Sequence, residues 1–213
     1  MAESHTGLAE QFDDLSQQRE AATLGMWTFL ATEILFFGTM FLGYIIYRHS
    51  YPQAFAEASR HTLVGLGTVN TAILLTSSLT MALAVHSVRQ GRQRPLVLFL
   101  GATVLFGVAF LVLKGFEYAE DLHQGLWPGP NFKPGLPPQA QIFWVLYWIM
   151  TGIHALHVGI GVGLLSVILW LSRCGKFSAA YHNPVEITGL YWHFVDVIWI
   201  FLYPLLYLIH RYS

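Results

Sequence analysis

Charged side chains are scarce in this sequence of 213 residues. Lys, Arg, Asp and Glu make up 11% of it, whereas they form about a quarter of an ordinary soluble domain. Apolar residues make up 54%, so the composition predicts a membrane protein. The formal net charge of −1 also lacks the basic excess of a nucleic-acid-binding protein.

Cysteine and internal repeats are the other notable absences. Cys174 is the single cysteine, which excludes a disulfide scaffold within the chain. It also excludes a zinc or iron–sulfur site built from several of its cysteines. The inverted-repeat architecture of many transporters has no support, because no repeat is found.

Long stretches with almost no charge locate the membrane spans, since about 20 helical residues cross a bilayer core. Five such stretches predict helices at roughly 22–47, 64–88, 95–118, 140–172 and 187–210. The stretches are continuously apolar, unlike the alternating strands of a spanning barrel. We therefore expect an all-α polytopic membrane protein, a bundle of five transmembrane helices.

The remaining segments set the expected organisation. Residues 1–21 are predicted to form a polar tail ahead of a membrane domain at 22–213, and the loop at 121–139 is predicted to be extended. Three arginines in the short loop 89–94 favour a cytoplasmic N-terminus and an external, periplasmic C-terminus. Pro204 should kink the last helix.

Glu33 is a carboxyl group in the middle of the first predicted helix, and no cation shares its face. It is either a proton-exchanging group or a neutral acid that donates one interhelical hydrogen bond. We expect it to face a second partner or lipid. Small and hydroxyl side chains on another face favour close helix packing; they are Gly25, Thr28, Thr32, Thr39 and Gly43.

His154 and His157 lie three residues apart and share one face of the fourth predicted helix. They form either a haem or metal site, completed by His86 and His193, or a hydrogen-bonding pair that fixes helix packing. We favour packing, because histidines commonly bond across membrane helices. The roughly opposite face is expected to pack closely and carries small residues: Gly152, Ala155, Gly159 and Gly163.

Two further groups of polar side chains lie in the predicted spans or at their ends. His193 and Asp196, three residues apart, can pair directly, either as a proton relay or as a structural anchor. Lys114, Glu117 and Asp121 share one face at the end of the third helix. We expect an interfacial ion-pair cluster with Lys114 reaching outward, unless Glu117 turns inward toward the histidines of the fourth helix.

Four ordered segments resemble subunit III of haem-copper terminal oxidases. They are LGMWTFLATEILFF at 24–37, GFEY at 115–118, HALHV at 154–158 and WHFVDVIW at 192–199. The resemblance implies the short five-helix form of a family whose members often have seven helices. It also implies that Glu33 is the membrane carboxyl that reacts with carbodiimide. It places Glu117, His154, His157, His193 and Asp196 at the family's interior polar positions.

The resemblance further implies an accessory subunit with no catalytic residues, haem or copper of its own, in a bacterial inner membrane. Haem and copper would lie in partner subunits, mainly subunit I, with subunit II and further small subunits nearby. The chain would support proton uptake and stability and hold phospholipid. The alternatives are an accessory protein of nitric oxide reductase and an independent proton-coupled transporter that uses Glu33.

Overall fold

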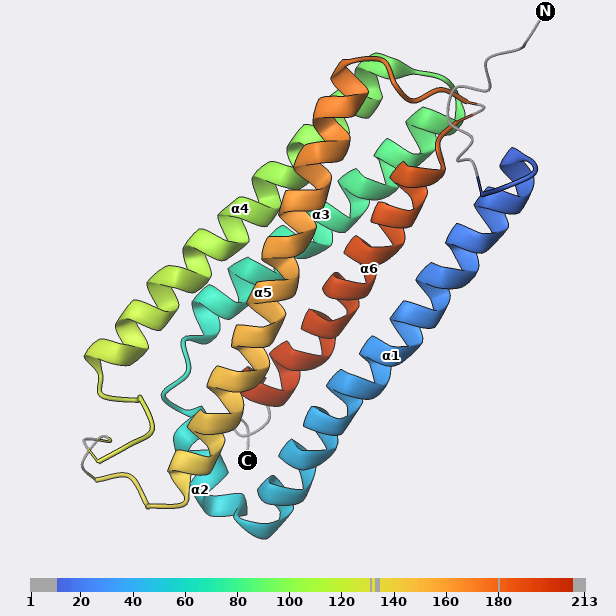
Figure 1. Ribbon diagram of the computed structural model, residues 1–213. Coiled ribbons are helices and arrows are strands. Elements are labelled where there is room, and N and C mark those ends of the chain that lie inside the picture. The colour runs from blue at the N-terminus through green and yellow to red at the C-terminus, as the bar shows by residue number, and fades with distance from the viewer. Residues whose placement is uncertain (1–10, 131, 133–134, 180, 209–213) are drawn as a thin grey trace, which may run out of the picture.

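The computed structural model is helical throughout its long elements and describes residues 11–130, 132, 135–179 and 181–208. Five long helices lie side by side, and α2 and the α4–α5 connection lie at one end of the bundle (Figure 1). The elements within these residues are α1 (Leu15–Ser50), α2 (Pro52–Ser59), α3 (Val64–Arg89), α4 (Gln93–His123), α5 (Ala140–Arg173), α6 (Asn183–Tyr203) and η1 (Pro204–Leu208).

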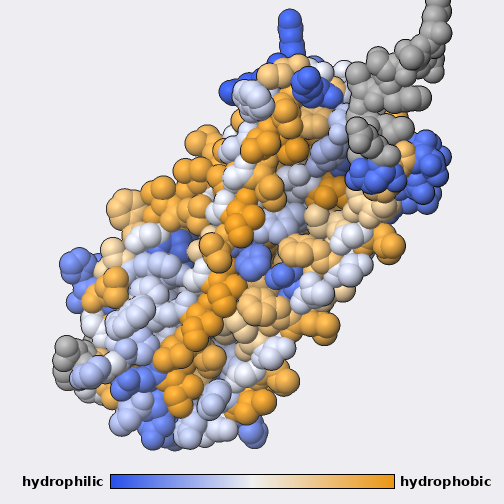
Figure 2. All heavy atoms as spheres, viewed as in Figure 1, coloured by the Kyte–Doolittle hydropathy of each residue, from blue (hydrophilic) through white to orange (hydrophobic). Residues whose placement is uncertain are grey.

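Five helical segments of the described chain are long and apolar enough to cross a membrane: α1, α3, α4, α5, and α6 together with η1. This confirms the predicted all-α class with five spans. Hydrophobic residues cover much of the visible face along the helices, and hydrophilic residues gather mainly toward its two ends (Figure 2). That distribution suits a bundle surrounded by hydrocarbon at its waist and by water at its ends.

Several helix ends differ from the predicted ones, most of all at the start of α1, at the end of α4 and at the end of α6. Helix α1 begins at Leu15, so residues 15–21 of the predicted polar tail are helical. Asp14 explains this start, because its carboxylate accepts the Gln17 N–H at 2.8 Å as an N-cap. Hydrogen bonds from the Ser16 hydroxyl and from the Gln17 N–H lower the pKa of Asp14.

At the other end of the bundle, α4 continues to His123, so the loop predicted at 121–139 begins with helix. Helix α2 was not predicted, and it begins with Pro52 at its first position, where a missing N–H does no harm. Helix α6 ends at Tyr203, and Pro204 opens a π-helical turn. The predicted disturbance at Pro204 is therefore a change of helix type, while residues 209–210 lie outside the described part.

Helix α6 is the centre of the bundle, packing against α1, α3 and α5. It is joined to the antiparallel α3 by a ladder of side-chain hydrogen bonds, each linking a residue of α6 to a hydroxyl of α3. The pairs with bond lengths are Trp192–Ser77 at 2.7 Å, His193–Ser78 at 2.7 Å, Trp199–Thr71 at 3.0 Å and Tyr203–Thr68 at 2.6 Å. Hydrogen bonds of this kind satisfy polar groups inside a membrane bundle, where water is not there to do so.

Trp192 requires glycine at two positions, one on α4 and one on α5. A Cβ atom on Gly107 of α4 would lie 2.7 Å from the Trp192 ring, and one on Gly161 of α5 would lie 2.9 Å from it. Both glycines therefore make room for an indole that is fully buried. The sequence had not singled out either glycine for this purpose.

The two predicted stripes of small residues do not pack within this chain. A Cβ atom on any of Gly25, Gly43, Gly152, Gly159 or Gly163 would meet no atom within 4 Å. The expectation of close packing at these positions is wrong inside the described chain. Both stripes face outward, because the buried positions of α1 and α5 lie on other faces of the helices.

We expect Gly107→Ala to lower the free energy of unfolding by about 1–3 kcal/mol, because the added methyl overpacks the Trp192 site. Gly101→Ala on the same helix is the matched control, since a Cβ atom there meets nothing within 4 Å. The unfolding midpoint of each variant in detergent measures the effect. Equal midpoints for the two variants would contradict this account of Trp192.

Candidate functional site

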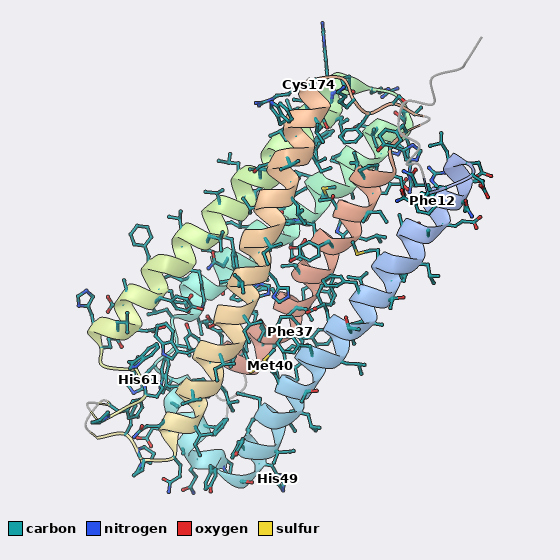
Figure 3. The ribbon with its side chains drawn as sticks, viewed as in Figure 1. Phe12, Phe37, Met40, His49, His61 and Cys174 are labelled. Carbon is teal, nitrogen blue, oxygen red and sulfur yellow. The ribbon has the colours of Figure 1, made fainter. Side chains whose placement is uncertain are left out.

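Glu33 on α1 pairs with His157 on α5. The distance from Glu33 Oε2 to His157 Nε2 is 3.2 Å, and the two side chains are 18% and 15% exposed. Phe37, which lies on the side of α1 toward α5 and α6 (Figure 3), places its ring edge-on at 5.3 Å from the imidazole. The second partner expected for Glu33 is thus a histidine of the same chain.

The other ring nitrogen of His157 determines how this pair shares its proton. Nδ1 lies 2.9 Å from the Ile153 carbonyl oxygen, and a carbonyl only accepts, so Nδ1 carries a hydrogen. Nε2 and Glu33 then share one proton between them. The pair is either a neutral acid bonded to a neutral imidazole or a carboxylate bonded to an imidazolium, and both forms leave it without net charge.

A second polar group lies deeper in the protein and is named here the lysine–tyrosine cluster. Its members come from α4, α5 and η1 and are all at most 1% exposed: Lys114, Glu117, Asp121, Tyr147 and Tyr207. Lys114 Nζ donates to the Tyr207 hydroxyl at 2.6 Å and to the Tyr147 hydroxyl at 3.0 Å. It also forms an ion pair with Glu117 Oε2 at 3.0 Å.

The cluster corrects the expectation that Lys114 reaches outward to the interface. The centroids of four aromatic rings lie 4.8 to 5.5 Å from the Lys114 Nζ atom. Aromatic rings at this distance attract a cation. Glu117 accepts hydrogen bonds from both tyrosines and not from His154 or His157. A carboxylate and aromatic rings therefore hold the lysine inside the bundle.

Sequence reasoning missed Tyr147 and Tyr207, which complete the cluster. Each is a single tyrosine in an apolar helix, and nothing local distinguishes it from a core aromatic residue. The one signal in the sequence was Lys114 itself. A lysine inside a membrane span, even with Glu117 three residues away, needs further polar partners. That signal does not identify the helices that supply them.

His154 is separate from His157 despite their shared helix. Its imidazole stacks on Trp199 of α6 at 5.2 Å between centroids, and meets the edge of Phe110 of α4 at 5.7 Å. Both ring nitrogens are buried without a hydrogen-bond partner in the described chain. Its contacts are thus aromatic, and the hydrogen bond predicted for the histidine pair is found at His157 alone.

The structure does not bring together the four histidines of the alternative metal or haem site. His86 bonds to Gln90 and His193 bonds to Ser78, so the two proposed suppliers do not join the histidines of α5. In the part of the chain that the structure describes, no three His, Cys, Asp or Glu side chains are grouped to hold a metal ion. Exposed Cys174 lies at the end of α5, at the far end from α2 (Figure 3).

His193 and Asp196 do not form the predicted pair. The His193 Nδ1 atom lies 2.7 Å from the Ser78 hydroxyl, and the same hydroxyl lies beside the buried carboxyl group of Asp196. The ladder between α6 and α3 thus takes the imidazole away from the acid. The expected interior polar positions form several separate contacts and not one network.

An apolar groove runs between α1 and α6. It holds about 490 Å³ and is lined on the α1 side by Leu30, Ile34 and Gly38, among others, and on the α6 side by Phe194 and Val197, among others. At His193 and Leu190 it meets a second hollow of about 370 Å³, whose lining is more polar. That lining includes Thr23, His86, Arg89 and Glu186.

These observations define a class first: an integral membrane bundle of five spans that holds two pairs of ionisable side chains, Lys114–Glu117 and Glu33–His157. Comparison with known proteins gives the family. Residues 13–210 match the model of the family described as cytochrome c oxidase subunit III, and the chain belongs to that family.

The relatives include subunits of both cytochrome c oxidases and quinol oxidases. Cytochrome c oxidase subunit 3 of Thermostichus vulcanus is 32% identical over 97% of this chain and 96% of its own. A probable quinol oxidase subunit 3 of Staphylococcus haemolyticus is 30% identical over 92% and 93%. Cytochrome c oxidase subunit 3 of Synechocystis is 34% identical over 87% and 74%.

Replacing Lys114 by Met should lower the free energy of unfolding by about 3–5 kcal/mol, because it leaves the Glu117 carboxylate buried without its cation. Glu117→Gln should have a comparable effect, since it leaves the ammonium unpaired. The double variant should lose much less than the sum of the two, as it removes both charges. Unfolding midpoints in detergent provide the measurement.

Lys176→Met is the matched control for this cycle, because Lys176 is exposed beyond the end of α5. It should leave the midpoint unchanged. Strictly additive losses in the double variant would show that the Lys114–Glu117 pair is not coupled.

Proposed function

We propose that this chain is a non-redox accessory subunit of a proton-pumping haem-copper oxidase, which packs against subunit I and supports its proton uptake and stability. The observation that carries the proposal is the family match across residues 13–210. Two pairs of ionisable side chains inside the described chain, Lys114–Glu117 and Glu33–His157, suit a subunit that sits within the membrane. We assign haem and copper to partner subunits on the basis of the family membership.

The outward face of α1 is the proposed contact with subunit I. Helix α1 lies at the edge of the bundle beside α5 and α6 (Figure 1). In its apolar stretch of 18 residues, 17% of the residues are buried, against 28–56% in the corresponding stretches of the other spans. The stripe from Gly25 to Gly43 lies on this open side. Thr28, Thr32 and Thr39 bond to carbonyls of their own helix, which leaves a smooth surface for a neighbouring helix.

Glu33 and His157 are the proposed proton-exchanging pair. Their shared proton can move between two atoms 3.2 Å apart without creating a net charge in the membrane. Both side chains are partly exposed at the surface of this chain, so a neighbouring subunit can contact the pair. Subunit II and further small subunits are expected in the same complex, in a bacterial plasma membrane with the N-terminus cytoplasmic.

Isolation in mild detergent tests the assignment. The wild-type chain should co-purify with a haem-carrying subunit I, identified by mass spectrometry. Thr32→Trp should release the chain from that complex, because the indole blocks approach to the open stripe on α1. Leu105→Trp, at an exposed position of α4, is the matched control and should stay associated.

The outcomes separate the alternatives. If a nitric oxide reductase co-purifies in place of subunit I, the chain is an accessory protein of that reductase. If the purified chain transports protons in liposomes, it is an independent proton-coupled transporter. The named relatives are oxidase subunits, which favours the oxidase. Because both donor types occur among those names, oxidation of cytochrome c or of quinol by the isolated complex is the measurement that identifies the electron donor.

The α1–α6 groove is the proposed site of a bound phospholipid. Its apolar part suits an acyl chain, and the adjoining hollow with Arg89 and His86 suits a headgroup. Gly38→Phe should fill the apolar part and lower the phospholipid that co-purifies with the chain. Gly101→Phe on α4, where the backbone is also open, is the control. Equal phospholipid content in both variants, measured by mass spectrometry, would exclude this groove.

A further inference from the structure

The lysine–tyrosine cluster holds several hydrogen-bond acceptors around a small number of hydrogens. Lys114 has three N–H donors. Its ammonium donates to the Tyr147 and Tyr207 hydroxyls and forms an ion pair with Glu117 Oε2 at 3.0 Å. Two donors of the ammonium are therefore committed to the tyrosines, and the ammonium faces Glu117 as its counter-ion. Each hydrogen bond between a tyrosine and a carboxyl group of the cluster must use a proton from the hydroxyl or from the carboxyl group.

The two tyrosine hydroxyls have one hydrogen each. The Tyr207 hydroxyl lies 2.6 Å from Glu117 Oε1 and donates to it. The Tyr147 hydroxyl lies 2.8 Å from Glu117 Oε1 and 3.0 Å from Asp121 Oδ2. The hydrogen can point along only one of these two contacts in a linear, strong hydrogen bond, so two ionised carboxylates would compete for it. One of these two contacts therefore needs a proton from the acid side.

Asp121 is the acid that fits this requirement. Glu117 faces the ammonium and two tyrosine hydroxyls, a setting that suits an ionised carboxylate. Asp121 has Tyr147 as its hydrogen-bond partner, and its Oδ1 atom is buried without one. Its ionisable neighbours are Lys114, Glu117, Glu120 and Tyr147.

We propose that Asp121 is a buried proton-binding site: a neutral carboxylic acid that donates to the Tyr147 hydroxyl and completes the cluster. The cluster then holds one ammonium, one carboxylate and one acid, and its net charge is zero. An ionised Asp121 would leave a net negative charge at an almost fully buried position, which is strongly disfavoured in a protein interior. The inference does not depend on the partner subunit, because it concerns contacts inside this chain.

Infrared spectroscopy of the full chain in lipid nanodiscs at neutral pH tests the proposal. The chain has four aspartates, Asp13, Asp14, Asp121 and Asp196, which can be labelled with ¹³C at the side-chain carboxyl. Protonated and ionised carboxyl groups absorb in separate regions, and the label shifts the aspartate bands. We expect Asp121→Asn to remove one labelled acid band, with no loss of labelled carboxylate intensity.

Asp14→Asn is the matched control, because Asp14 is exposed outside the bundle. It should lower the labelled carboxylate band and leave the acid bands unchanged. Loss of carboxylate intensity in Asp121→Asn, with the acid bands intact, would overturn the proposal.

A second variant covers the case in which Asp121→Asn does not fold. In Asp196→Asn, Asp121 is the one remaining buried aspartate, since Asp13 and Asp14 are exposed. A labelled acid band that persists in this variant supports a protonated Asp121. The absence of any labelled acid band would show that Asp121 is ionised.

Discussion

Pairing of charge inside hydrocarbon is the constraint on which this structure depends. A membrane interior offers no water to solvate an ion, so each buried charged group needs a partner in the protein. Lys114 and Glu117 meet this demand with an ion pair supported by two tyrosine hydroxyls. Glu33 and His157 meet it with a shared proton. Each solution joins segments that are far apart in the sequence.

These contacts also explain which helices belong together. The lysine–tyrosine cluster links α4 to α5 and to η1, and the acid–histidine pair links α1 to α5. The hydroxyl ladder links α3 to α6, and the glycines beside Trp192 allow α6 to approach α4 and α5. The interior is thus held by a few specific polar bonds and by close aromatic packing, as expected where lipid removes most of the hydrophobic drive between helices.

The outward faces of α1 and α5 are the other feature that bears on function. Small residues that the sequence placed in packing stripes find no partner within the described chain, and α1 has the least buried of the spans. An accessory subunit needs such a face, because its contacts with neighbours replace contacts with lipid. The paired interior and the open α1 face are consistent with a protein that assembles with others in the membrane.

The sequence by itself determined the spans, their number and the family, because runs of apolar residues and four ordered motifs are local properties. It also identified Glu33, Glu117, His154, His157, His193 and Asp196 as polar groups at membrane depth. Only the tertiary structure decided their partners. Residues three apart on one helix, such as His193 and Asp196, can pair, but Ser78 on α3 takes the imidazole. Lys114 turns inward because Tyr147 and Tyr207 come from distant segments, and no local pattern records which helices will meet.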